Sequence, residues 1–106
     1  MVEIPILDWS GDAESAIVEE SSRLGLTVSS DGKLASYPGS RHWHIKNGRR
    51  SGTLEVTLWP SRNRLCVTYH SNRVGDGWVS ESALVLARGL AAGLNGRLPE
   101  EVRRDE

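Results

Sequence analysis

Three consecutive segments of this chain alternate polar and apolar residues, and this pattern limits the fold more than any other feature of the sequence. The segments are residues 41–46, 53–59 and 64–70. A period of two is that of a β-strand, whose successive side chains point to opposite faces of a sheet. The connections between the segments are short enough for neighbouring strands to run antiparallel. The pattern therefore predicts an antiparallel meander with one apolar and one polar face.

The parity of the alternation assigns each side chain to a face. The apolar face receives Trp43, Ile45, Leu54, Val56, Leu58, Leu65, Val67 and Tyr69. The polar face receives His42, His44, Lys46, Thr53, Glu55, Thr57, Trp59, Arg64, Cys66, Thr68 and His70. Tight connections predict the polar neighbours His44–Glu55, Glu55–Thr68, His42–Thr57 and Thr57–Cys66. A slip of one residue would expose the apolar row, so the parity is strongly specified.

The chain before these segments predicts a helix and a short hairpin. Residues 13–24 have helical spacing after N-cap candidates at 10–12, and the glycine that follows them suits the C′ position. Residues 26–29 and 34–37 are typical of two short strands, with Asp31-Gly32 as the turn between them.

Each end of the chain adds one further element. Residues 1–7 predict an additional strand, which Pro5 confines to an edge because proline donates no ladder hydrogen bond. Residues 81–94 predict a second helix, with Ser80 as its N-cap and Asn95-Gly96 as its end.

Together these elements predict an α+β fold of two layers. Two helices would cover the apolar face of an antiparallel meander of three to five strands, in helix–strands–helix order. Residues 1–96 form one globular domain in this interpretation, and residues 97–106 form a polar tail that frays.

Composition excludes several classes of protein. No apolar run approaches the roughly 18 residues that span a bilayer, and the N-terminus lacks the pattern of a signal peptide. The single cysteine, Cys66, rules out an internal disulfide framework and fits the reducing cytoplasm. We therefore expect a cytoplasmic protein without membrane partners.

The charges of the chain are unevenly distributed along it. Residues 33–73 hold eight Lys and Arg against one acid, Glu55, although the whole chain has a formal charge of −1. The same stretch contains all three His and four of the six aromatic residues. A basic, aromatic, His-bearing surface indicates an anionic partner.

The hypothesis that follows is a non-catalytic binding protein whose polar sheet face contacts a polyanion. Single-stranded nucleic acid is the polyanion that the sequence favours. Aromatic rings stack on bases while Arg and Lys neutralise phosphates. The candidate anion contacts are Arg41, Lys46, Arg49, Arg50, Arg62 and Arg64, the candidate stacking residue is Trp59, and His42, His44 and His70 would form hydrogen bonds or respond to pH.

Two other hypotheses involve the same face. A homodimer or a protein partner could bury it, with Trp59 as the anchor of the interface. A His-centred metal or hydrolytic site is the other, because His42 and His44 project about 7 Å apart on one side of a strand. Its third ligand would be Glu55 or the more distant Cys66 or His70. The sequence contains no nucleotide-binding, hydrolase or zinc-protease motif, so it predicts no catalytic residue, no resident metal and no cofactor.

Overall fold

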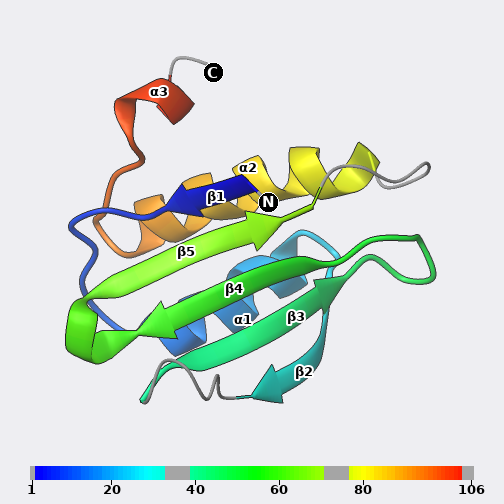
Figure 1. Cartoon of the computed structure of the whole chain (residues 1–106), viewed down its shortest axis with the longest axis horizontal. Helices are drawn as coiled ribbons and strands as arrows, with labels where there is room; N and C mark the ends of the chain where they lie inside the picture. The colour runs from blue at the N-terminus through cyan, green and yellow to red at the C-terminus, as the bar shows by residue number, and fades with distance from the viewer. Residues whose placement is uncertain (1, 33–38, 71–76, 104–106) are drawn as a thin grey trace.

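The computed structural model describes residues 2–32, 39–70 and 77–103 (Figure 1). Strands and helices are distributed along the chain as the α+β prediction requires, with one sheet between an early and a late helix. The elements in chain order are β1 (Val2–Pro5), α1 (Ala13–Arg23), β2 (Thr27–Gly32), β3 (Arg41–Lys46), β4 (Leu54–Trp59), the 3-10 turn η1 (Pro60–Arg62), β5 (Arg64–Tyr69), α2 (Gly77–Gly93) and α3 (Glu100–Arg103).

Within the described residues the sheet has five strands in the order β1-β5-β4-β3-β2, and every neighbouring pair is antiparallel. The three central strands start and end within one residue of the alternating segments. β1 forms the edge beside β5 and contains Pro5, as predicted. β2 forms the opposite edge beside β3.

The register of the central strands is the one that parity predicts. His44 pairs with Glu55, and His42 pairs with Thr57. Across the next ladder, Glu55 pairs with Thr68 and Thr57 pairs with Cys66. All four predicted neighbours on the polar face are therefore confirmed.

The core lies between the sheet and two helices on one of its sides. Figure 1 shows α1 and α2 together behind the strands. Ile45, Leu54 and Val56 of the sheet and Leu86 and Leu90 of α2 all have 0% exposure. Because each such side chain contributes about 1.5–3 kcal/mol on full burial, this layer is the main source of stability.

Helix α1 is fixed at both ends by local hydrogen bonds. The Asp12 carboxylate accepts the backbone N–H of Ser15 at 3.1 Å and its hydroxyl at 2.8 Å. These bonds hold the pKa of the Asp12 carboxyl below its ordinary value. At the other end Gly25 adopts φ +74°, and the N–H groups of Gly25 and Leu26 close onto carbonyls of the last turn. The glycine serves as the C′ residue of a Schellman motif, as predicted.

The hairpin predicted around Asp31-Gly32 is wrong. Both residues lie inside β2, where they pair with Trp43 and His42 of β3. A bulge between Val28 and Ser30 allows β2 to follow β3. Pairing with β3 gives β2 a place in a five-stranded sheet, whereas a short isolated hairpin is only marginally stable in water. The predicted partner strand, 34–37, lies outside the described residues.

Helix α2 starts four residues earlier than predicted, so Ser80 lies in its first turn and is not its N-cap. The Ser80 hydroxyl donates to the carbonyl of Gly77 at 3.3 Å. The earlier start buries Trp78 and Val79, and the Trp78 indole N–H donates to the Ser51 carbonyl at 2.6 Å. No helix in the described residues, α2 included, is long and apolar enough to cross a membrane.

The chain after α2 returns to the N-terminal strand. Arg97 and Leu7 exchange two backbone hydrogen bonds, of 2.7 and 2.8 Å. Leu98 belongs to the core, with 4% exposure. The sequence predicts that a frayed tail starts here, but Arg97 is held by its backbone hydrogen bonds and Leu98 by burial in the core.

The close approach at Gly96 yields a prediction about stability. A Cβ atom at Gly96 would lie 2.8 Å from the carbonyl oxygen of Leu7 and 3.0 Å from Cγ2 of Ile6. Because the Leu7 carbonyl is fixed backbone, we expect Gly96→Ala to lower the free energy of unfolding by about 1–3 kcal/mol. Urea denaturation followed by circular dichroism measures the change.

Gly93→Ala is the matched control, because Gly93 is the last residue of α2, three residues before Gly96, and a Cβ there meets nothing within 4 Å. Replacing a helical glycine by alanine is expected to leave stability unchanged or raise it by up to about 1 kcal/mol. Equal stabilities of the two variants would contradict the packing described at Gly96.

Candidate functional site

The face of the sheet that points away from α1 and α2 carries the polar residues that parity assigns to it. We call it the uncovered face, and its described members are Glu3, His42, His44, Lys46, Glu55, Thr57, Trp59, Arg64, Cys66 and Thr68. Cys66 and Thr68 are only 3% and 7% exposed although α1 and α2 lie on the other side of the sheet (Figure 1). The uncovered face is therefore not open to solvent along its whole length.

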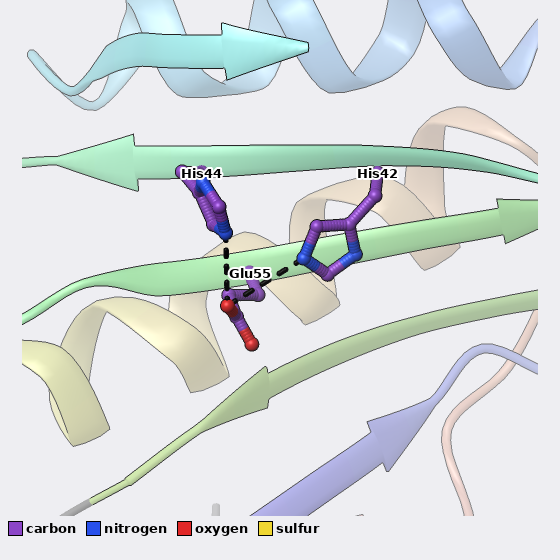
Figure 2. Close-up of side chains that lie close together, drawn as sticks. All are labelled: His42, His44 and Glu55. Carbon is purple, nitrogen blue, oxygen red and sulfur yellow. Dashed lines mark ion pairs between the residues drawn. The ribbon is translucent and has the colours of Figure 1, made fainter. Parts of the chain in front are cut away.

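Two imidazoles and one carboxylate converge at the middle of the uncovered face. Figure 2 shows the rings of His42 and His44, both on β3, turned toward Glu55 on β4. Glu55 Oε1 lies 3.0 Å from Nε2 of His44 and 3.5 Å from Nε2 of His42. One potential metal-ligand atom from each residue lies within 4.8 Å of the others. We call these three residues the His–Glu cluster.

Thr57 fixes the orientation of one ring of the cluster. Its hydroxyl oxygen lies 2.9 Å from Nδ1 of His42, directly across the β3–β4 ladder. In the tautomer that donates Nδ1–H to this oxygen, Nε2 of His42 keeps its lone pair on the side of Glu55. The ring of His42 also meets the ring of His44 edge to face, with centroids 5.0 Å apart.

A shallow open depression of about 390 Å³ adjoins the cluster. It is lined by Ser29, His44, Lys46, Thr53 and Glu55. The Lys46 ammonium donates to the Gly52 carbonyl at 2.8 Å and to the Thr53 hydroxyl at 3.1 Å. The depression therefore contains a fixed positive charge and the negative charge of Glu55.

The β3–β4 connection carries two adjacent arginines at one end of the face. Arg49 and Arg50 are exposed, and neither makes an ion pair with another described residue. A turn closes the connection through a 3.1 Å hydrogen bond from the Arg50 N–H to the Asn47 carbonyl, with Gly48 at φ +58°. The bonds to Ser51 and Gly52 described above hold the rest of it. The backbone that carries both arginines is thus fixed at several points.

A second group of basic residues lies at the opposite end of the face. The Arg62 guanidinium sits 5.5 Å above the ring of Trp59, a cation–π geometry. Trp59 pairs with Arg64 across the β4–β5 ladder. Arg64 itself donates to Glu3 of the edge strand at 2.7 Å, so part of its charge is already compensated.

Two of the predicted site residues lie apart from these groups. Arg41 has the parity of the apolar row; its guanidinium lies 5.1 Å from the Trp43 ring and donates to Glu14 of α1 at 2.7 Å. It serves to join α1 to the sheet. His70 is exposed and follows the last residue of β5, and it does not belong to the His–Glu cluster.

Cys66 is buried between neighbours of the uncovered face. Burial raises the pKa of its thiol above the ordinary value, and the negative charge of Glu3 raises it further, whereas Arg64 acts in the opposite direction. The thiol is therefore protonated near neutral pH, a state in which it is neither a nucleophile nor a metal ligand.

Sequence reasoning missed two contributors to this surface. Glu3 reaches it because β1 pairs with β5, opposite Thr68. Ser29 reaches the depression, and its hydroxyl donates to the His44 carbonyl at 3.2 Å. The alternation of Glu3 with Val2 and Ile4 is a signal from which the place of Glu3 could have been predicted. The place of Ser29 could not, because the bulge in β2 interrupts the alternation there.

Comparisons with protein-family models, with curated proteins and with solved structures found no match for this chain. The functional argument therefore rests on the geometry of the uncovered face.

The environment of Cys66 predicts a slow reaction with thiol reagents. In the folded protein we expect the disulfide reagent DTNB to react at pH 8 more than about tenfold slower than in denaturant, since burial limits both access and thiolate formation. Absorbance at the thionitrobenzoate band follows the reaction of this single cysteine. Free glutathione serves as the exposed-thiol control, and a native rate close to that of glutathione would contradict the burial of Cys66.

Proposed function

We propose that this protein binds a polyanion on the uncovered face without catalysing a reaction, and that the polyanion is single-stranded nucleic acid. The observation that carries the proposal is the joint presence of Trp59 and Arg62 at one end of the face and of Arg49 and Arg50 at the other. Cations and an aromatic ring on one sheet surface are the elements with which such proteins contact phosphates and bases.

The state of the arginine pair supports this proposal. Arg49 and Arg50 project from a connection whose backbone is held by its own turn and by Trp78. A fixed backbone lowers the conformational entropy that is lost when a ligand binds. Because these two guanidinium groups have no ion pair within the described residues, a phosphate can approach them without displacing a carboxylate.

The other residues predicted to contact an anion are not all part of this proposal. Arg62 and Lys46 remain in the proposal, Lys46 as a fixed charge beside the depression. Arg64 would have to share its guanidinium with Glu3, and Arg41 has no part because it bonds Glu14 on the other side of the sheet. His42, His44 and His70 would supply hydrogen bonds. We assign this activity to the cytoplasm because the chain carries one buried, reduced cysteine.

The arginine pair provides the first test. Replacing both Arg49 and Arg50 by Gln should weaken binding of short single-stranded DNA and RNA equally across sequences. If each arginine neutralises one phosphate, the slope of log affinity against log salt should fall by about 1.4 in magnitude. Fluorescence anisotropy of labelled oligonucleotides over a series of salt concentrations measures both effects.

A double change of Arg23 and Arg97 to Gln is the matched control. Both are exposed, lie outside the five strands and pair with Glu20 and Asp8 respectively. This control removes the same number of positive charges, two, from other parts of the molecule. An equal loss of affinity in both double variants would show that only net charge matters, and it would contradict the proposal that Arg49 and Arg50 contact phosphates.

Trp59 provides a separate test of stacking. Trp59→Ala should weaken single-strand binding by about 5- to 150-fold, the equivalent of the roughly 1–3 kcal/mol that stacking of one base contributes. Trp59→Phe keeps a ring and should retain most of the affinity. Light scattering of the same samples follows oligomeric mass. A wild-type dimer that dissociates on Trp59→Ala, with no binding of nucleic acid, would instead identify the face as a protein interface.

A further inference from the structure

The geometry points to a binding site for a divalent transition metal of the zinc class, formed by His42, His44 and Glu55 on the uncovered face. This site lies between the arginine contacts that are proposed for a polyanion at the two ends of the sheet. His42 and His44, to which the proposed function gives only hydrogen bonds, would be ligands here. It uses the middle of the face, where the three side chains already converge (Figure 2).

The distances within the His–Glu cluster suit such an ion. Zinc binds imidazole nitrogen and carboxylate oxygen at about 2.0–2.2 Å, which places two ligands of a tetrahedral site about 3.4 Å apart. Glu55 Oε1 lies 3.0 and 3.5 Å from the two imidazole nitrogens. The three ligand atoms all lie within 4.8 Å of one another. Small side-chain rotations would bring each of them to bonding distance from one ion placed between them.

The backbone beneath the cluster is rigid for reasons that have nothing to do with a ligand. The residues that alternate with the cluster on β3 and β4 are Trp43, Ile45, Leu54 and Val56, all at most 3% exposed. Their packing fixes the strand positions of His42, His44 and Glu55. A prearranged site needs no reorganisation of the chain when an ion binds.

Thr57, next to the cluster, forms the kind of hydrogen bond that holds a metal-binding histidine in place. Metal-binding histidines generally hold their second ring nitrogen in a hydrogen bond, which fixes the tautomer and the ring orientation. Thr57 provides this bond at 2.9 Å to Nδ1 of His42. Nε2 of the same ring faces Glu55, as a metal ligand must.

The identity of the donors restricts the ion. Two nitrogens and one oxygen suit Zn²⁺, Co²⁺, Ni²⁺ or Fe²⁺, whereas Mg²⁺ and Ca²⁺ prefer oxygen ligands throughout. The cluster is reachable from solvent, since the side chains of His44 and Glu55 are 42% and 28% exposed. Solvent would complete the coordination. The ammonium of Lys46 in the adjoining depression opposes a dication, so the Glu55 carboxylate is essential to the site.

The test uses the full chain with any His tag removed. Titration with Zn²⁺ in a calorimeter should show one ion per chain, and Co²⁺ should give visible absorption bands of a low-coordinate site. His44→Ala and Glu55→Gln should each weaken Zn²⁺ binding by more than about 100-fold, beyond the range that loss of an outer-shell partner causes. Thr57→Val should weaken it by about 10- to 100-fold, because it removes the partner of His42 and no ligand.

His70→Ala is the control, because it removes an exposed histidine outside the cluster, and it should leave Zn²⁺ affinity unchanged. Circular dichroism of each variant establishes that it is folded. Absence of Zn²⁺ binding by the wild-type chain would overturn the inference. A loss of Zn²⁺ affinity in His70→Ala equal to that in His44→Ala would also overturn it, because His70 lies outside the cluster. Half an ion per chain in a dimer would overturn it too, because the ion would then be shared between two chains.

Discussion

Burial of one apolar row of the sheet beneath α1 and α2 sets the positions of the strands and of the polar side chains between the members of that row. The row has to face α1 and α2, and a strand slipped by one residue would expose it to water at a cost of several buried side chains. Every residue between members of the row is thereby directed to the other face. The His–Glu cluster is therefore positioned by a core that its side chains do not enter.

The fold redistributes the charges that are segregated along the chain. Acidic residues from outside the basic stretch meet two of its arginines: Glu14 of α1 bonds Arg41, and Glu3 of β1 bonds Arg64. These pairs join the helix layer and the edge strand to the central strands. Exposed ion pairs of this kind contribute little stability, about 0–1 kcal/mol each, but they remove positive charge from potential binding surfaces. Among the described arginines of this stretch, Arg49 and Arg50 in the β3–β4 connection and Arg62 beside Trp59 form no such pair.

The elements that the sequence predicted correctly are those with a strong local period. The central strands and their register follow from alternation alone, and the edge position of β1 follows from Pro5. The errors lie where tertiary contacts outweigh local signals. Asp31-Gly32 is a good turn sequence, yet β3 offers this stretch a longer ladder. Ser80 is a good N-cap, yet burial of Trp78 starts α2 earlier.

For the candidate site, the alternation in the sequence was enough to assign the side chains of β3, β4 and β5 to the uncovered face, because a period of two leaves no choice once the other face is buried. It also determined that His44 and Glu55 are neighbours, since the connection between their strands is short. The turn of His42 toward Glu55, with Thr57 holding its ring, could not be predicted from the alternation, because a rotamer depends on neighbours from several strands. Likewise only the packing of α1 and β1 decided that Arg41 and Arg64 are paired, because their partners come from distant parts of the chain.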